Sequence, residues 1–314
     1  MTAAEFDDWS AHSVDGFVRQ QVDAGLQPEA DARRDAVRVF AAELPDGVAT
    51  RYHHFRRVVD AASAESVGNL WLRVRPQPTG VEGYVFDVEL LSAARGRGLG
   101  RATMLAGHDL ARSLGATRMR LNVFGHNRGA VGLYGSLGYT VVDSTLHRRL
   151  DDLGTPPAGP RVHLREMTPA EYAVSRPHLE EAYARNLPSS GSMPEEEARR
   201  TPADGLVRLL PDGLATPGHR LWTAYDGSDP VGAVWVQLQH RSDGLHAFGH
   251  SLEVREDLRR RGYGRAVVDA AMRTCRELGA HTGGLTVSGS DPGEGRLYGA
   301  LGFRLTAQTM VLPL

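Results

Sequence analysis

The sequence predicts an α/β protein built from two copies of one unit, each a mixed, mostly antiparallel sheet flanked by helices. Three observations support this prediction. Five short segments recur in the same order along the 314 residues. Strand-like and helix-like runs alternate in the same way within each copy. A Gly/Pro-rich stretch, "DDLGTPPAGP", separates the copies. The chain is long enough for two domains of ordinary size, each with its own core.

The repeat stays in register across the chain, with an offset of 166 residues at first and 164 after a two-residue gap. We therefore expect an N-terminal domain over residues 1–150, a linker over 151–161 and a C-terminal domain over 162–314. The matched segments are "MTAAEF" with "MTPAEY", "LPDGVAT" with "LPDGLAT", "VGNLWLRV" with "VGAVWVQL", "RGRGLGR" with "RRRGYGR", and "LYGSLGY" with "LYGALGF".

Each copy is expected to begin with two helices and to continue with three strands, the third of which ends at the Arg/Gly segment. The helix after that segment should end at Gly115 or Gly279, in the position after a helix where glycine is favoured. Another strand, a short helix and a terminal strand complete the copy. The helices expected at the start lie near residues 3–25, 28–43, 169–186 and 195–210.

The two copies differ at their first strand. The second copy has "RVHLRE" before its "MTPAEY" segment, whereas the first copy starts at Met1. We therefore expect either that the true N-terminus lies further upstream, or that the first unit lacks its opening strand, which would leave that sheet edge open or covered by the other domain.

Composition narrows the functional classes. A net charge of −2 gives no global basic field for nucleic acid. No apolar run has the length needed to cross a bilayer, and the N-terminus lacks the pattern of a signal peptide, so we expect a cytoplasmic protein without a membrane partner. No Cys/His cluster has zinc-like spacing, so no metal is expected. The chain has no lysine, and all 36 of its Lys and Arg residues are arginine, which excludes a P-loop lysine and a Schiff-base lysine.

The repeated Arg-x-x-Gly-x-Gly segment lies where a strand turns into a helix. Its glycines remove side chains at the turn, and the first N–H groups of the helix have no internal acceptor. Together with the helix dipole they form an anion cradle, for which phosphate or pyrophosphate is the expected ligand. The expected cradle residues are Arg95, Gly96, Arg97, Gly98, Leu99, Gly100 and Arg101 in the first copy, and Arg259, Arg260, Arg261, Gly262, Tyr263, Gly264 and Arg265 in the second.

Two other interpretations of this segment stay open at the level of residue pattern. It can be an ordinary helix start surrounded by solvated arginines. It can also be a dinucleotide-binding loop, but that loop needs a third glycine where this chain has Arg101, and it belongs near the start of its domain.

At these residues the chain resembles the GCN5-related N-acetyltransferases. The family signature is Arg/Gln-x-x-Gly-x-Gly/Ala after the fourth strand, followed by Asn-x-x-Ala-x-x-x-Tyr and Leu-Gly-Phe/Tyr; the chain has "NRGAVGLYGSLGY" and "DPGEGRLYGALGF" at the second motif. The resemblance implies that acetyl-CoA binds with its pyrophosphate on the cradle and its pantetheine arm between splayed fourth and fifth strands. The tandem arrangement also resembles that of the mycothiol synthases.

The resemblance implies roles for several side chains. Tyr134 or Tyr298 would lie near the CoA sulfur and donate a proton to the leaving thiolate, a task suited to a phenol with a pKa near 10. Asn127 would contact the pantetheine, and the second copy has Asp291 there. Backbone N–H groups of the fourth strand would polarise the thioester carbonyl; these lie around Val88 and Leu90 in the first copy and around Leu252 and Val254 in the second.

The general base is the least specified role. Counting back from the first arginine of the cradle, the positions where family members often place a base hold His250 and Phe248 in the second copy. His250 is therefore a candidate base. The first copy has Phe86 and Tyr84 there, so its candidates are the nearby Asp87 and Glu89, of which a bulge in the strand could turn one inward.

We expect an N-acetyltransferase that moves an acetyl group directly from acetyl-CoA to a primary amine of a small molecule, as a monomer or homodimer. The alternatives are a non-catalytic acyl-CoA sensor or scaffold and a mycothiol synthase-like enzyme. Because Asp291 replaces asparagine, the first copy is favoured as the catalytic unit, although Asp291-Pro292 also makes a good helix start. His53 and His219 align in the two copies and are expected to be structural.

Overall fold

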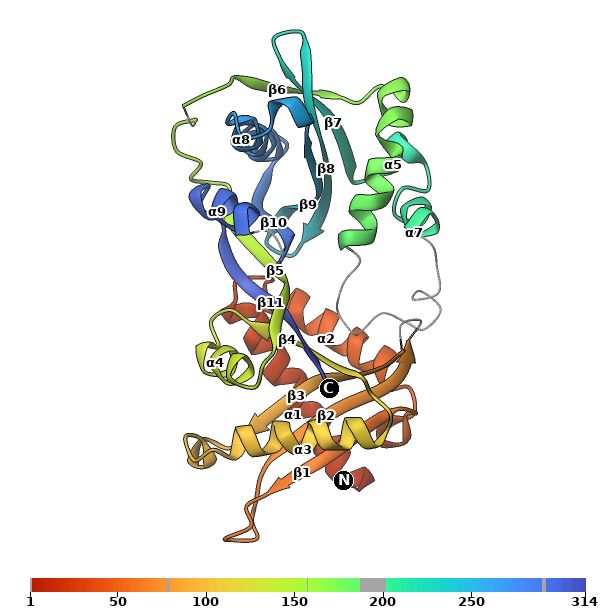
Figure 1. Ribbon diagram of the computed structural model, residues 1–314, viewed down its shortest axis with the longest axis vertical. Coiled ribbons are helices and arrows are strands. Elements are labelled where there is room, and N and C mark those ends of the chain that lie inside the picture. Colours follow the sequence, from red (N-terminus) through yellow and green to blue (C-terminus); the bar gives the residue numbers. More distant parts are fainter. Residues whose placement is uncertain (1, 78–79, 157, 187–201, 290–291) are drawn as a thin grey trace. The chain divides into compact units, whose positions relative to one another are not determined.

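The computed structural model describes residues 2–77, 80–156, 158–186, 202–289 and 292–314 (Figure 1). Within these residues, no helix combines the length and the apolar character required to cross a membrane. The first repeat forms α1 (Ala3–Asp23), α2 (Glu29–Glu43), β1 (His53–Val59), β2 (Ser66–Gln77), β3 (Gly80–Leu90), α3 (Leu99–Ser113), β4 (Arg118–Phe124), α4 (Arg128–Ser136) and β5 (Thr140–Arg149).

The second repeat follows the same order after one additional strand, β6. The predicted helix near 195–210 corresponds to α7, and its part over 195–201 lies outside the described residues. The elements are β6 (Val162–Glu166), α5 (Pro169–Asn186), α7 (Pro202–Leu209), β7 (His219–Asp226), β8 (Asp229–Arg241), β9 (Gly244–Val254), α8 (Tyr263–Glu277), β10 (Ala280–Ser288), α9 (Pro292–Ala300) and β11 (Arg304–Pro313).

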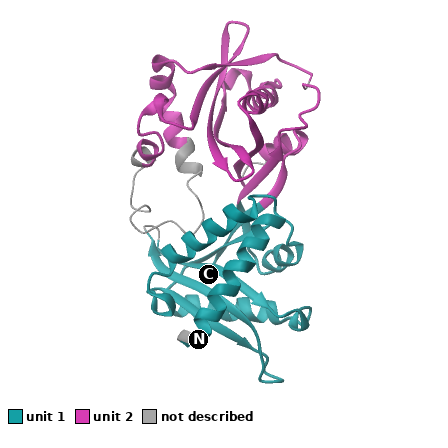
Figure 2. Ribbon diagram, turned by 180° about the vertical axis from the view of Figure 1, so that it is seen from behind, with its two compact units in different colours: residues 1–142, 188–199, 307–314 teal, residues 143–187, 200–306 magenta. Residues whose placement is uncertain are grey.

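The chain forms two compact units (Figure 2). Of the described residues, unit 1 contains 2–142 and 307–314, and unit 2 contains 143–186 and 202–306. Each unit therefore takes its last strand from the other repeat.

In unit 1 the strand order is β1-β2-β3-β4-β11. The neighbouring strands are antiparallel except β3 and β4, which are parallel. Among the described residues, no strand of this sheet lies beyond β1.

In unit 2 the strand order is β6-β7-β8-β9-β10-β5. Here β9 and β10 are the parallel pair, and the other neighbours are antiparallel. The additional strand β6 pairs with β7 from Val162–Asp226 to Glu166–Trp222. The two sheets thus share a mixed, mostly antiparallel pattern, as the sequence predicted.

The last strands are exchanged between the repeats. β11, from the second repeat, pairs with β4 from Ala307–Phe124 to Pro313–Arg118 and buries Met310 in the core of unit 1. β5, from the first repeat, pairs with β10 from Ser288–Asp143 to Thr282–Arg149. Leu150, which follows β5, is fully buried in the core of unit 2.

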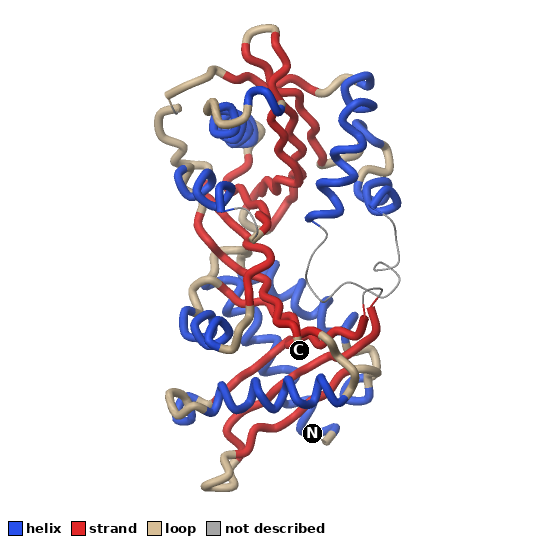
Figure 3. Tube along the Cα trace, in the orientation of Figure 1, coloured by secondary structure: helices blue, strands red, loops and turns tan. Residues whose placement is uncertain are grey.

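Helices cover both faces of each sheet, as Figure 3 shows for strands in red and helices in blue. In unit 1, Phe6 and Trp9 of α1 pack on Phe55 and Trp71 on one face. The other face packs against α3 and α4. Unit 2 repeats this arrangement, with α5 and α7 on one face and α8 and α9 on the other. The layers follow from the strand pattern, because alternate side chains point to opposite faces.

The aligned histidines His53 and His219 are structural, as predicted. The indole N–H of Trp71 donates to His53 Nδ1 at 2.9 Å, and that of Trp235 donates to His219 Nδ1 at 2.9 Å. Both histidines lie beneath the first helices of their units, where a buried indole N–H requires an acceptor.

Candidate acyl-transfer site

A β-bulge sets the direction of the side chains at the end of β3. Leu72 pairs with Val85 and Trp71 pairs with Asp87, so Phe86 is the extra residue. A bulge puts two successive side chains on the same face. Phe86 therefore packs with Trp71 beneath α1 and α2, and Asp87 also faces α1.

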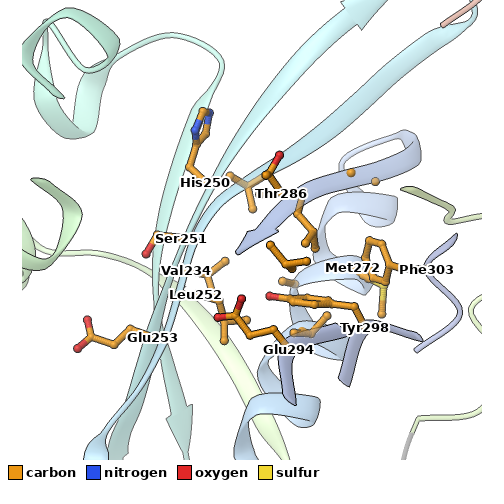
Figure 4. A pocket seen from close by; sticks show the side chains of 18 of the residues that line it. Val234, His250, Ser251, Leu252, Glu253, Met272, Thr286, Glu294, Tyr298 and Phe303 are labelled. Atoms are coloured by element: carbon orange, nitrogen blue, oxygen red, sulfur yellow. The ribbon is translucent and has the colours of Figure 1, made fainter. Parts of the chain in front are cut away.

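The second repeat has the same bulge at the same place. Val236 pairs with Gly249 and Trp235 pairs with Ser251, which leaves His250 as the extra residue. In Figure 4, Ser251 and Glu253 point to one side of β9, whereas Leu252 lies on the side of Tyr298. The bulge therefore separates two walls of one site, a polar wall facing α5 and an apolar wall facing α8 and α9.

The parallel strands pair only over their first halves. β3 and β4 pair from Glu82–Arg118 to Val85–Leu121, and β9 and β10 pair as far as Gly249–Leu285. Among the described residues, the rest of each strand continues without a strand partner on that side. This is the position where the family resemblance implies that a pantetheine arm would enter.

In unit 2 a cavity of about 790 Å³ lies at this position. Its volume is within the range of small-molecule sites in proteins. His178, Ser251 and Glu253 line it from the α5 face, and Met272 and Tyr298 line it from the α8 and α9 face. The cavity therefore connects the two faces of the sheet beside the end of β9.

The helices after the Arg/Gly segments start without a side-chain cap. Gly98 precedes α3 with φ 81° and Gly262 precedes α8 with φ 90°, and neither helix start receives a side-chain hydrogen bond. Both residues are left-handed, which explains glycine at this place. The first-turn N–H groups of Leu99 and Gly100, and of Tyr263 and Gly264, are therefore not used by a capping side chain, which fits an anion site.

Several predicted cradle arginines hold the loop itself. Arg95 Nε donates to the carbonyl of Leu90 at 3.0 Å, and Arg259 Nε donates to that of Val254 at 3.3 Å. The same bond in both repeats ties the loop to the end of its strand. It uses only Nε, so Nη1 and Nη2 of each guanidinium do not take part in it.

The other basic residues of the two loops differ. In unit 1, Arg97 pairs with Asp60 at 2.8 Å and Arg101 donates to Ser136 Oγ at 3.0 Å. In unit 2 the hydroxyl of Tyr263 donates to Asp226 at 2.7 Å. Asp60 and Asp226 end the corresponding strands of the two repeats. In the described part of unit 2, the side chains of Arg260, Arg261 and Arg265 form no hydrogen bond or ion pair.

The two predicted tyrosines are buried at equivalent places. Tyr134 of α4 packs in the core of unit 1 and Tyr298 of α9 in that of unit 2. Burial, with a smaller effect from Asp87, raises the pKa of Tyr134 to about 12, and burial also raises the pKa of Tyr298. Both phenols therefore keep their protons at neutral pH and can donate one. Figure 4 shows Glu294 beside Tyr298.

Asp87 and Glu89 lie together on the α1 face of unit 1. Ser13 Oγ lies 3.5 Å from Asp87 Oδ2, and His12 Nε2 lies 3.1 Å from Glu89 Oε1. Burial first, and then the charge of Glu89, raise the pKa of Asp87 to about 6. A carboxylate with that pKa can accept a proton near neutral pH.

His250, the predicted base of the second copy, stacks on Trp235 with ring centroids 4.4 Å apart. Its Nε2 lies 3.3 Å from Oε1 of Gln237. Burial, and next the neighbouring His219, lower its pKa to about 3. The protonated ring is therefore disfavoured, so His250 would hold an abstracted proton poorly.

Asn127 caps α4, because its side-chain oxygen accepts from the N–H of Ala130 at 3.1 Å. Its counterpart Asp291 lies outside the described residues, and α9 begins at Pro292, as the Asp291-Pro292 pattern predicted. Val88 and Leu252 pack on the α3 and α8 faces of their sheets, and Leu252 and Val254 line the unit 2 cavity. The carbonyl of Leu90 holds Arg95.

Residue patterns missed His12, Ser13, His178 and Glu253, which the structure places at these sites. A signal for the histidines was present in the sequence. Each is the twelfth residue of its copy when the copies are counted from Met1 and Met167.

The fold and these motifs agree with the comparison to known proteins. The profile of the acetyltransferase (GNAT) family matches residues 27–139 and 179–303. The chain belongs to the acetyltransferase (GNAT) family. Each match covers most of one repeat, so this is a tandem GNAT protein.

Relatives of this GNAT protein include single-repeat and longer proteins. The uncharacterized N-acetyltransferase YdgE of Bacillus subtilis is 31% identical over 150 residues, which cover 48% of this chain and 95% of YdgE. A mycothiol acetyltransferase of Renibacterium salmoninarum is 38% identical over 80 residues, or 25% of this chain and 24% of that protein.

A solved structure extends the fold similarity to nearly the whole chain. A GCN5-related N-acetyltransferase from Sphaerobacter thermophilus aligns with a TM-score of 0.52 and 17% identity, covering 93% of this chain and 89% of that one. As a GNAT member, the protein is an acetyltransferase.

Proposed function

We propose that the protein transfers an acetyl group from acetyl-CoA to a primary amine of a small molecule, and that both units carry this activity. The observation that supports it most directly is the unit 2 cavity, which reaches from the α5 face to Tyr298 beside the end of β9. Unit 1 repeats the bulge, the uncapped helix start and the buried tyrosine.

Acetyl-CoA supplies an activated acyl group as a thioester. The residues that fit it are the first-turn N–H groups of α3 and α8, which carry no side-chain cap and can accept the pyrophosphate. Arg259 also lines the cavity and adds positive charge. What the protein must still provide is proton transfer, because the acceptor enters as an ammonium and the CoA leaves as a thiolate.

The protein side chains provide for both proton movements. On one side of the strand, Asp87 and Glu89 in unit 1, and Glu253 in unit 2, can take a proton from the acceptor. On the other side, Tyr134 and Tyr298 retain a proton that a leaving thiolate can accept. The carboxylate and the phenol lie on opposite faces of β3 or β9, so the two transfers do not compete.

The test is thiol release from acetyl-CoA with a panel of amines that includes the acceptor of the mycothiol acetyltransferases. Tyr134→Phe and Tyr298→Phe should each remove part of the turnover, and the double variant should lose at least about tenfold. Calorimetry with CoA should show unchanged affinity in all three variants. CoA binding without turnover of any amine would instead indicate the sensor or scaffold, and absence of CoA binding would refute the proposal.

A further inference from the structure

The first helix of each repeat places a histidine against a glutamate near the end of the bulged strand. His12 Nε2 of α1 lies 3.1 Å from Glu89 Oε1, and His178 Nε2 of α5 lies 3.8 Å from Glu253 Oε1. The same pair is therefore built twice, from the same two positions of the repeat.

Packing does not require this pair. The side chains of His12 and Glu89 are 57% and 34% exposed, and those of His178 and Glu253 are 60% and 36% exposed. Exposed ion pairs contribute little to stability. The helix residues around the two histidines also differ, "DDWSAHSV" against "AVSRPHLE". The helix has changed while the histidine and its contact have stayed.

The pair lies between the proposed reaction site and solvent. Glu89 shares the α1 face with Asp87, beside Ser13, and Asp15 is a further carboxylate near His12. In unit 2, His178 and Glu253 line the cavity together with Glu181 and Ser251. The glutamate thus borders the site, and the more exposed histidine borders water.

Acetyl transfer to an ammonium releases one proton per turnover, and that proton must leave the site. We propose that His12 and His178 are proton-exit residues that act through Glu89 and Glu253. This inference rests on the proposed acetyl transfer and adds the route of the acceptor's proton. An imidazole suits the role because it binds and releases protons near neutral pH through two ring nitrogens.

The proton balance is simple. One N–H bond of the acceptor ammonium breaks and an O–H bond forms on the glutamate, which leaves a neutral amine. The nitrogen loses a second proton when the amide forms, and that proton replaces the one that the phenol gives to the thiolate. The glutamate passes the proton to Nε2 of the neutral imidazole and becomes a carboxylate again. The imidazolium then loses a proton from its other nitrogen to water, which restores the starting state after tautomer exchange.

The experiment compares His12→Gln/His178→Gln with the wild-type chain in the thiol-release assay, using the best amine of the panel. Glutamine is a polar side chain that can still donate to the glutamate, but it cannot carry a proton. We expect kcat to fall at least about fivefold with little change in KM for acetyl-CoA. Added imidazole should restore much of the loss, because a soluble base can take the proton from the glutamate.

His281→Gln is the matched control. His281 is 59% exposed and its Nδ1 lies 3.5 Å from Asp151, so it is another exposed histidine beside a carboxylate, outside the site. It should leave kcat unchanged and show no response to imidazole.

Three outcomes separate the proposals. A kcat loss in the double variant that imidazole restores supports the exit route. An unchanged kcat, or a loss that imidazole does not restore while CoA affinity is intact, overturns it but leaves acetyl transfer standing. Absence of turnover in the wild-type chain with every amine refutes the proposed function itself.

Discussion

The hydroxyl of Ser13 lies 3.5 Å from Oδ2 of Asp87, a contact between α1 and the bulged end of β3. The second repeat has Leu179 and Ser251 at these positions, so the buried acid belongs to unit 1 alone. The two sites therefore have a glutamate at the same position, Glu89 or Glu253, but differ at the neighbouring buried position, which holds Asp87 in unit 1 and Ser251 in unit 2.

Asp87→Asn should make unit 1 more stable and less active. Because the folded pKa of Asp87 is about 6, above the ordinary aspartate value of 3.8, the folded state binds its proton more tightly than the unfolded chain does. That contribution favours folding at low pH and is lost as pH rises through 6. At pH 7.5 the asparagine should raise the free energy of unfolding by about 1–3 kcal/mol.

Hydrogen exchange in α3 tests this prediction. Protection of α3 in the variant should exceed that of wild type at pH 7.5, and the difference should shrink toward pH 5 after correction for intrinsic exchange. In a Tyr298→Phe background the same variant should lower the thiol-release rate. An equal gain at both pH values would show that ionisation of Asp87 is not the cause.

Arg260→Gly should stabilise unit 2. Arg260 has φ 62°, in the left-handed region, whereas its counterpart in the first repeat is Gly96 with φ 74°. A side chain there costs about 1–2 kcal/mol, and the added freedom of glycine in the unfolded chain offsets part of this. We expect a net gain of about 0.5–1 kcal/mol in the free energy of unfolding of unit 2, measured by urea with α8 protection as the probe.

Arg260→Ala is the control for Arg260→Gly. It removes the guanidinium but keeps the Cβ atom and thus the backbone strain. A gain in the alanine variant equal to that of glycine would contradict the backbone explanation.

Leu150→Ala should destabilise unit 2, although Leu150 belongs to the first repeat. Its side chain is fully buried with the α8 core, and such truncations cost about 2–5 kcal/mol. Met310→Ala should destabilise unit 1 in the same way, because Met310 is 3% exposed in that core. Protection from hydrogen exchange in α3 (Leu99–Ser113) reports on unit 1, and protection in α8 (Tyr263–Glu277) reports on unit 2. If Leu150→Ala lowered protection in α3, or Met310→Ala lowered it in α8, the exchange of the last strands would be refuted.

Unit 2 should lose stability as the pH falls from 6.5 toward 4. His147 of β5 stacks on His246 of β9 with ring centroids 4.7 Å apart. Burial, and then the charge of Arg241, lower the pKa of His147 to about 4 and that of His246 to about 2. The unfolded chain binds protons in this window that the folded chain excludes, so each group costs about 1.4 kcal/mol per pH unit.

Thermal unfolding followed through α8 should show this pH dependence, and His246→Gln should reduce it. Glutamine can still reach Thr282, whose Oγ1 lies 2.7 Å from His246 Nδ1. A pH dependence that is unchanged in the variant would assign the effect to other groups.

Local patterns predicted much of this fold. Gly115 and Gly279 follow their helices with φ 86° and 93°, as expected from the Leu-Gly-Ala segments. The tyrosines, the uncapped helix starts and the bulged strand lie where the repeated motifs indicated. These features depend on residues close together in the chain, so their patterns suffice.

The strand exchange could not be predicted in this way. β5 and β11 occupy the same place in their repeats, and both units offer an equivalent edge at β4 or β10. A terminal strand with suitable apolar residues can pair with either β4 or β10, so the periodicity of its sequence does not predict which of the two it joins. His12 and His178 were also not predicted as site residues, because the role inferred for them depends on contacts with Glu89 and Glu253, which are far away in the sequence.

The exchanged strands also govern how the molecule can be dissected. A gene cut at the proline-containing connection would encode two fragments, each carrying the closing strand that the other requires. A self-sufficient single-centre version would need the first 139 residues joined directly to residues 304–314. This shortened, reconnected protein would show whether one unit is active without the other.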